Sequence, residues 1–155
     1  MDNGRRIRTA RWNMYRYRAN KDAVENYFSN VLYGTNDVGV HGIQTSNISD
    51  PTARGGIALA TLPDDLKEKW EWVKAVDEAW EECKQYDSQN EIDFGLAYVM
   101  EKQFCLTGEK RPKSKNAVAK LKICRDCHIA ERTYYNWLRQ ITDAVVYYAT
   151  KRGIL

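Results

Sequence analysis

The sequence has no uninterrupted apolar run of the roughly 18 residues that a membrane-spanning helix requires, so we expect no membrane partner. Its N-terminal segment, MDNGRRIRTARW, is basic but is not followed by an apolar stretch, which argues against a secretory signal. The chain has only four cysteines, and without export we expect them to be free thiols rather than disulfides. We therefore place the protein in the cytoplasm.

The sequence also lacks the local signatures of most enzymes. It has only two histidines, no glycine-rich loop that would cradle a phosphate, and no motif that pairs a nucleophile with a base. No segment alternates polar and apolar residues as a β-strand does, and no internal repeat is present. These absences predict an all-α protein that is not an enzyme.

The net charge of +3 conceals a segregation of charge along the chain. Residues 1–21 carry seven basic side chains against one acidic side chain, a net of +6. Residues 22–108 carry six basic against sixteen acidic side chains, a net of −10, and residues 109–155 carry eleven against four, a net of +7. Basic ends around an acidic centre predict a polyanion-binding surface beside a region that avoids nucleic acid. A solvated charged surface without a partner is the alternative.

Apolar residues at steps of three and four predict an amphipathic helix over about 10–32, with its inward stripe formed by Trp12, Tyr15, Ala19, Ala23, Tyr27 and Val31. Five glycines and an Asp-Pro pair then predict a long loop over 33–56. A second helix is expected from Pro63, because proline suits a first helical position. Asp64 and Asp65 follow it, where the helix dipole favours negative charge.

The polar segment 86–90, YDSQN, predicts a boundary between an N-terminal region, 1–88, and a C-terminal domain, 89–155. A third helix should follow and close near Thr107-Gly108. Its inward residues are expected to be Ile92, Leu96, Val99, Met100 and Phe104. The basic connector GEKRPKSKN contains Pro112, which forbids a continuous helix there.

The segment ICRDCHIAERTYYNWL, residues 123–138, fits more than one pattern. Cys124, Cys127 and His128 match C-x-x-C-H, the spacing of covalent haem attachment, but that attachment follows export, which we do not expect. A zinc site that adds Cys105 has suitable ligands but lacks a second closely spaced pair. Both explain few of the residues, so we expect neither a haem nor a metal.

A helix-turn-helix frame accounts for nearly every residue of the same segment. Cys124 occupies the small position of the first helix, His128 the turn and Ile129 the aliphatic position after it. Tyr134 and Trp137 are then the inward pair of the second helix. The apolar stripe continues through Leu138, Ile141, Val145 and Tyr148, which predicts one helix over 131–151.

Two residues depart from the usual helix-turn-helix sequence pattern. The turn position usually carries glycine, because a positive φ costs glycine little, so His128 should be strained there. The residue before the second helix is usually Ser or Thr, which caps the helix, but Ala130 stands there. A plain helical corner without a DNA-binding role is the alternative reading of the motif.

In this frame the outward residues of the second helix would read DNA. Arg132, Asn136 and Arg139 are the base-edge candidates, because arginine can bind guanine bidentately and asparagine can bind adenine in the same way. Thr133 and Tyr135 suit a thymine methyl group or a phosphate. Candidate phosphate-binding residues before and along the first helix are Lys113, Lys115, Lys120, Lys122 and Arg125. Solvated surface charges are the alternative for each.

Three segments carry a resemblance to a known family: YRYRANKDAVENY (15–27), ISDPTARGGIAL (48–59) and IAERTYYNWLRQI (129–141). With them, most of the chain resembles the phage-encoded late-gene transcriptional activators of the RinA and ArpU type. Their C-terminal part is similar to region 4 of bacterial sigma factors. The resemblance therefore implies an N-terminal helix, a long loop, an acidic helix and a C-terminal three-helix sigma region-4-like helix-turn-helix unit.

The resemblance also implies a function. It implies a sequence-specific activator that binds double-stranded promoter DNA of phage late or packaging genes in the host cytoplasm and acts with host RNA polymerase, without a cofactor. The acidic helix and the loop would serve partner binding or self-association, with a homodimer as one arrangement. A small terminase-like DNA-packaging recognition protein is the alternative, because such proteins also combine a helix-turn-helix with oligomerising helices.

Overall fold

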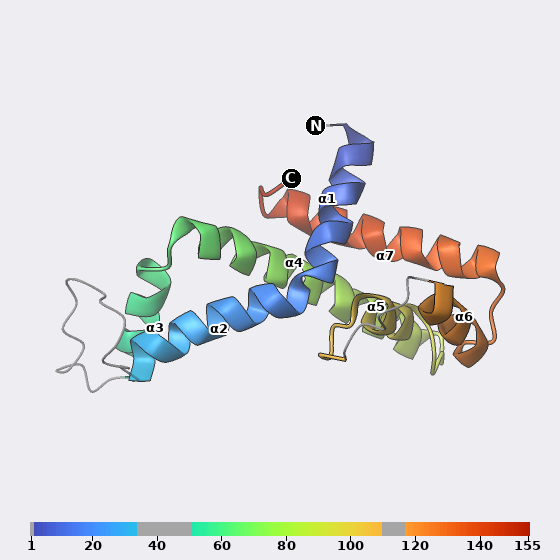
Figure 1. Ribbon diagram of the computed structural model, residues 1–155, viewed down its shortest axis with the longest axis horizontal. Helices are drawn as coiled ribbons and strands as arrows, with labels where there is room; N and C mark the ends of the chain where they lie inside the picture. Colours follow the sequence, from blue (N-terminus) through green and yellow to red (C-terminus); the bar gives the residue numbers. More distant parts are fainter. Residues whose placement is uncertain (1, 34–50, 110–116) are drawn as a thin grey trace. The chain divides into compact units, whose positions relative to one another are not determined.

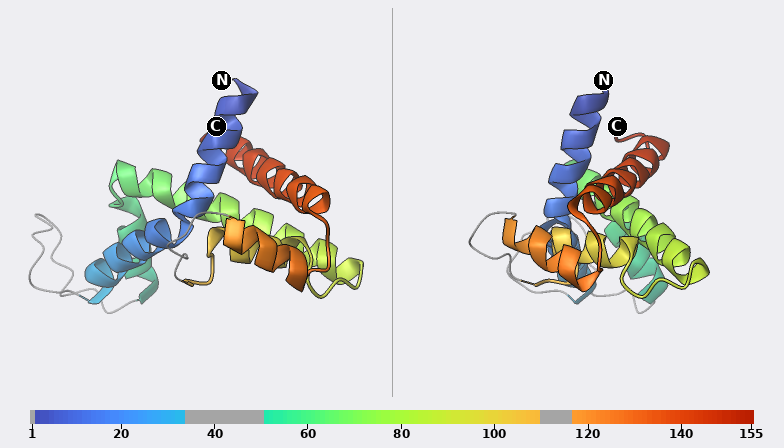
Figure 2. Two further views of the ribbon diagram at one scale, coloured as in Figure 1. Left: turned by 45° about the vertical axis from the view of Figure 1, so that its right-hand side comes forward. Right: turned by 90° about the vertical axis from the view of Figure 1, so that its right-hand side faces the viewer.

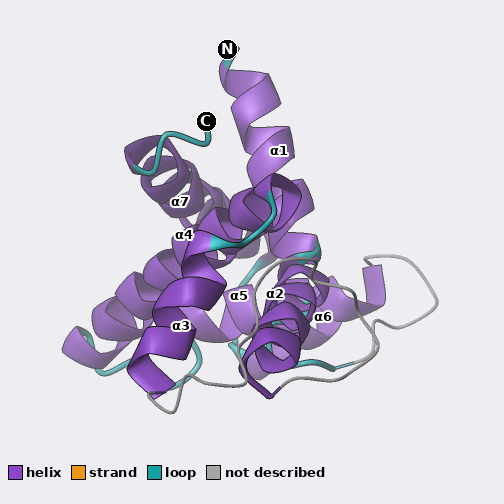
Figure 3. Ribbon diagram, turned by 90° about the vertical axis from the view of Figure 1, so that its left-hand side faces the viewer, coloured by secondary structure: helices purple, strands orange, loops and turns teal. Residues whose placement is uncertain are grey.

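The computed structural model describes residues 2–33, 51–109 and 117–155, and these residues form helices and loops with no strand among them (Figures 1 and 3). The predicted all-α class is therefore confirmed. The helices are α1 (Asn3–Tyr15), α2 (Tyr17–Tyr33), α3 (Pro51–Ala60), α4 (Asp64–Gln89), α5 (Leu96–Phe104), α6 (Ala117–Asp126) and α7 (Glu131–Lys151). In the part of the chain that is described, no helix is both long enough and apolar enough to cross a membrane.

The single helix expected over 10–32 is wrong, because the chain forms α1 and α2 with a break at Arg16. Arg16 has φ −97° and ψ 2°, outside the helical range. The buried stripe of α1 consists of Ala10 and Met14, whereas Trp12, which we expected to face inward, is 60% exposed. The aromatic periodicity was therefore wrong for Trp12, although the ring of Tyr15 from the same stripe meets that of Phe104 with centroids 4.8 Å apart.

The loop expected over 33–56 is also wrong at its end, since α3 begins at Pro51. Proline is compatible with the first turn of a helix because its missing N–H would be unpaired there in any case. Residues 34–50 of the expected loop lie outside the described residues. The start of the second predicted helix is confirmed, with Asp64 and Asp65 in the first turn of α4.

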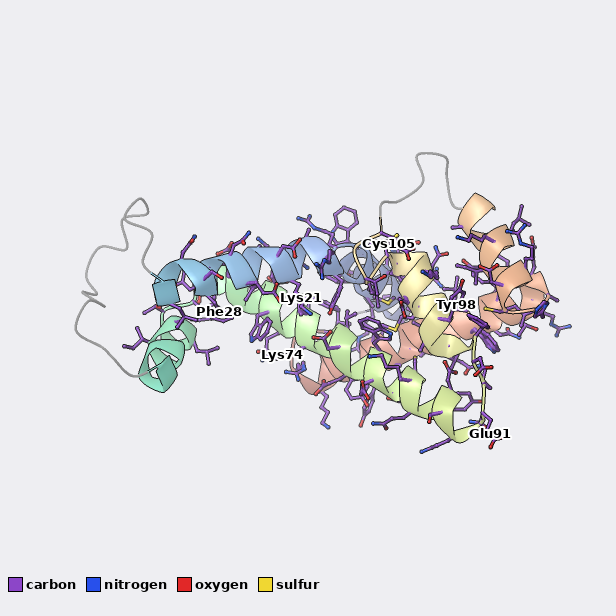
Figure 4. The ribbon with its side chains drawn as sticks, turned by 90° about the horizontal axis from the view of Figure 1, so that it is seen from below. Lys21, Phe28, Lys74, Glu91, Tyr98 and Cys105 are labelled. Carbon is purple, nitrogen blue, oxygen red and sulfur yellow. The ribbon has the colours of Figure 1, made fainter. Side chains whose placement is uncertain are left out.

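The chain divides into two compact units, one formed by residues 1–18 and 71–155 and the other by residues 19–70. In the smaller unit the Tyr27 hydroxyl donates to the Thr61 carbonyl at 2.8 Å. The rings of Phe28 and Trp70 meet edge to face with centroids 5.8 Å apart (Figure 4 labels Phe28). The functional division expected between residues 88 and 89 stays a prediction.

In the larger unit α1 packs against α7, α5 packs against α6 and α7, and α6 packs against α7 (Figure 2). Four of the inward residues predicted for the third helix are confirmed for α5, where Leu96, Val99, Met100 and Phe104 are buried. The fifth, Ile92, is wrong, because it precedes α5 and is half-buried. Ile141 and Val145 of α7 are fully buried in the same unit. This core fixes the face that α7 leaves exposed.

The C-terminal end of α7 is held by ion pairs to α4. Arg152 donates from Nη1 to Glu71 at 2.8 Å, and from Nε and Nη2 to the two oxygens of Glu78 at 3.0 and 2.8 Å. Burial alone raises the pKa of Glu71, but hydrogen bonds from Lys74 and Arg152 outweigh it, so the net pKa is lowered. The same pairs raise the pKa of Arg152, with the Glu78 hydrogen bond as the largest cause. A bidentate arginine–carboxylate pair is geometrically specific, so it fixes the axial position of α7.

Candidate nucleic-acid interface

The turn between α6 and α7 has the geometry that the sequence predicted. His128 has a φ of +54°, in the left-handed region. The Ile129 N–H donates to the Cys124 carbonyl at 3.0 Å, and the His128 N–H donates to the Arg125 carbonyl at 3.2 Å. This pair of bonds is a Schellman motif, which pairs the last carbonyls of α6 and turns the chain sharply.

The second helix begins as expected after Ala130, which has extended dihedral angles of −73° and 157° and makes no side-chain capping bond. Its predicted bounds, 131–151, are confirmed by α7. Tyr134 is buried, as predicted for an inward residue, whereas Trp137 and Ile129 are half-buried. The tight turn and the buried ring of Tyr134 together set how α7 is rotated about its axis.

The rotation of α7 leaves the candidate base-reading side chains in solvent. Arg132, Asn136 and Arg139 are all exposed, and Tyr135 is 53% exposed. Thr133 is half-buried. The positions are spaced by three and four residues, so Arg132, Asn136 and Arg139 form one stripe along the first turns of the helix. Asparagine and arginine side chains on one exposed stripe can pair with base edges.

The candidate phosphate residues of α6 differ in their surroundings. Lys122 and Arg125 are exposed. Lys120 is half-buried: its Nζ lies 2.6 Å from a carboxylate oxygen of Glu131 and 5.6 Å from the ring centroid of Tyr135. The hydrogen bond to Glu131 is the largest cause of the raised pKa of Lys120, so this side chain is charged at neutral pH. Lys113 and Lys115 lie outside the described residues.

Helix α6 is fastened to α5 by a hydrogen bond from the Tyr98 hydroxyl to Asp126 at 2.8 Å (Figure 4 labels Tyr98). Burial, followed by this bond, raises the pKa of Tyr98 to about 12, so the phenol keeps its proton and remains a donor. Because Asp126 is the last residue of α6, the bond fixes the end of the helix directly before the turn.

A polar network that the sequence did not predict joins three helices behind the exposed face. Gln103 of α5 donates from Nε2 to the Tyr15 hydroxyl of α1 at 2.8 Å, and the Tyr134 hydroxyl of α7 donates to Gln103 Oε1 at 2.6 Å. Gln103 and Tyr134 are buried, and burial raises the pKa of Tyr134. A glutamine between apolar positions suggests a buried polar contact, but the sequence could not identify its partners, which lie 88 and 31 residues away.

The four cysteines are free thiols among the described residues. Burial, with smaller contributions from Asp126 and other neighbours, raises the pKa of Cys127 to about 11, and burial raises the pKa of Cys124. Within the described ranges no group of three or more histidine, cysteine or carboxylate side chains is placed to hold a metal ion. The arrangement thus offers exposed cations and amides, and the thiols of Cys124 and Cys127 are protonated at neutral pH.

The chain matches no known protein-family model, no curated protein and no solved structure. The geometry and chemistry of the exposed face of α7 therefore carry the functional argument.

Proposed function

We propose that this protein is a sequence-specific DNA-binding activator of transcription that works with host RNA polymerase at phage late or packaging genes. In this proposal α5, α6 and α7 form the three-helix sigma region-4-like unit, and α7 is the recognition helix. The acidic helix α4 and the 33–56 segment serve partner binding or self-association. The choice of late genes and of the polymerase rests on the resemblance to activators of the RinA and ArpU type.

The observation that carries the proposal is the exposed stripe of Arg132, Asn136 and Arg139 on a helix that a tight turn seats against α6. An α-helix with its side chains is about 10–12 Å wide, which fits the roughly 12 Å major groove of B-DNA. The buried side of α7 holds the helix in the core, so its opposite side is free to enter that groove. Each bidentate pair with a base is worth about 1–3 kcal/mol of discrimination.

Sequencing the DNA fragments that the purified full chain retains at moderate salt would provide the specific duplex. In a titration against that duplex and a random duplex, the variant Arg132→Ala/Asn136→Ala/Arg139→Ala should lose discrimination between the two. A second triple variant on the same helix, Gln140→Ala/Thr150→Ala/Lys151→Ala, also replaces three exposed residues, one of them a cation, and should keep it. Discrimination that survives the first set of substitutions would remove α7 as the recognition helix.

Activation is tested separately from binding. Transcription from a template carrying the specific duplex, with host RNA polymerase, should rise when the protein is added and should not rise with the first triple variant. The mass of the protein in solution separates the packaging alternative, because a ring of many subunits would favour packaging over transcription. A monomer or dimer with stimulated transcription is the expected result.

A further inference from the structure

The basic N-terminal helix lies against the candidate recognition helix. α1 packs on α7 within the larger compact unit (Figure 2). The Arg11 Nε donates to the Thr142 Oγ1 of α7 at 3.4 Å, across a separation of 131 residues in the sequence. Arg11 therefore lies against the candidate recognition helix, a position that the local sequence did not predict.

A pocket of about 380 Å³ opens where α1, α5, α6 and α7 meet. Arg11, Lys120 and Tyr135 line it, and Arg11 and Tyr135 are exposed, so they lie at its mouth. Tyr134 and Gln103 also line it and are buried, so they lie at its base. The lining of the pocket thus includes a cation of α1, a cation of α6 and an aromatic side chain of the candidate recognition helix.

The charge at this mouth is positive. Lys120 pairs with Glu131, which neutralises part of its charge, while Arg11 is bonded only to the neutral Thr142 hydroxyl among the described residues. Arg8 is exposed three residues before Arg11, roughly 4.5 Å along the helix axis. Successive phosphates of one DNA strand advance by about 3.4 Å, so two arginines with flexible side chains at this spacing can reach neighbouring phosphates.

We propose that the mouth of this pocket binds a backbone phosphate of the duplex between Arg11 and Lys120, and that Arg8 binds a neighbouring phosphate. Helix α1 is then a second DNA-contacting element, which positions α7 without reading bases. The inference rests on the proposed function, because it requires a duplex in the groove beside α7. It extends the DNA-binding surface beyond residues 89–155.

The test compares the salt dependence of binding by the full-length protein and by Arg8→Gln/Arg11→Gln. Each phosphate contact contributes about 0.9 to the slope of log affinity against log salt, so the variant's slope should be smaller by about 1.8. Between 50 and 200 mM salt, the affinity of the unsubstituted protein should then fall about 12-fold more than that of the variant. The ratio of affinities for the specific and random duplexes should stay unchanged.

Three controls separate phosphate binding from a structural role. Lys67→Gln/Lys69→Gln also removes two charges, but from lysines that pair with Asp64 and Asp65 on α4, and should keep the slope of the unsubstituted protein. Thr142→Val removes the partner of Arg11 without changing charge and should also keep it. Arg8→Lys/Arg11→Lys restores both charges and should restore most of the slope. Circular dichroism melting should show each variant to be folded.

The outcomes distinguish the two proposals. An unchanged slope in the Arg8→Gln/Arg11→Gln variant, with discrimination intact, overturns the α1 contact and leaves the recognition helix standing. A reduced slope together with a lost difference in affinity between the specific and random duplexes also overturns it. That result would mean that α1 contacts bases and not the phosphate backbone alone. A full-length protein that never discriminates between duplexes overturns the proposed function and this inference with it.

Discussion

The carboxylate of Asp87 sets the start of α5, and a double-mutant cycle with Gly95 can measure its contribution. Asp87 lies near the end of α4 and is 7% exposed. Its Oδ1 accepts from the Leu96 N–H at 3.0 Å and its Oδ2 accepts from the Ala97 N–H at 2.8 Å. The N-cap residue of α5 is Gly95, which has no side chain, so a residue of the preceding helix supplies the cap.

The variant Asp87→Ala leaves these N–H groups without their acceptor. An unsatisfied buried donor costs about 1–3 kcal/mol, and loss of an N-cap costs about 0.5–2 kcal/mol. Partial access of water to the Ala97 N–H reduces the sum, so we expect a loss of about 2–4 kcal/mol in the free energy of unfolding. Asp93→Ala, at an exposed carboxylate in the same connection, is the control and should change it by less than about 0.5 kcal/mol.

The variant Gly95→Ala should act through the same carboxylate. A Cβ at this position would lie 2.2 Å from Asp87 Oδ1 and 2.6 Å from its Cγ, closer than atoms can approach. Gly95 has φ −116° and ψ −142°, and the double-mutant cycle separates the clash with the Asp87 carboxylate from any cost of the backbone itself. Displacing the carboxylate removes the cap, and we expect a loss similar to that of Asp87→Ala.

The double variant Asp87→Ala/Gly95→Ala is the decisive measurement. Once the carboxylate is gone, the alanine at position 95 has nothing to displace, so the loss in the double variant should fall well short of the sum of the two single losses. The coupling free energy should then be about 2 kcal/mol, well above the 0.3–0.5 kcal/mol scatter of independent sites. Urea unfolding followed by circular dichroism gives all four free energies. Additive losses would refute the capping role assigned to Asp87.

The other predictions concern the turn, the end of α7 and the thiols. His128→Gly should raise the free energy of unfolding by roughly 0.5 kcal/mol, because relief of about 1–2 kcal/mol of left-handed strain exceeds the cost of the entropy that glycine adds to the unfolded chain. His128→Val should lower the free energy of unfolding. Equal melting temperatures of the two variants would contradict this. Arg152→Gln should lower the free energy of unfolding at pH 7 by about 1 kcal/mol. The pKa of Glu71 is lowered in the folded protein, so this stabilisation is present above its ordinary value of 4.5 and is lost as the pH falls through the folded pKa. If urea titrations give the same difference in free energy between the unsubstituted protein and Arg152→Gln at every pH, that result would count against the pairing. Cys127 should be alkylated far more slowly at pH 7 in the folded protein than in urea, because its pKa is raised to about 11, and mass spectrometry showing equal rates would exclude the buried thiol.

Local patterns in the sequence were enough to place several elements. The period of the apolar residues gave the bounds of α7, and the aspartates after Pro63 gave the start of α4. The glycine-type position in the turn predicted the positive φ of His128. These features depend on residues within one or two helical turns of each other, because helix periodicity, capping and turn geometry are local properties of the backbone.

The periodicity of the apolar residues did not predict correctly which residues of α1 are buried. Trp12 fits an apolar stripe with the aromatic residues after it, yet it is exposed and Ala10 and Met14 are buried in its place. The α1–α2 break at Arg16 ends the stripe, because each helix then buries its own residues. An amphipathic pattern shows that a buried side exists, but the neighbouring element decides which residues form it.

The amino-acid sequence by itself determined an all-α chain, a long C-terminal helix and a turn that exposes Arg132, Asn136 and Arg139. Only the tertiary structure decided that Arg11 lies beside that helix and that Gln103 joins α1 to α7. Those contacts join residues far apart in the chain, and their geometry depends on how whole helices pack, which no local period encodes. The acidic charge of the middle of the chain could be counted from the sequence, but the placing of a basic N-terminal helix on the candidate recognition helix could not.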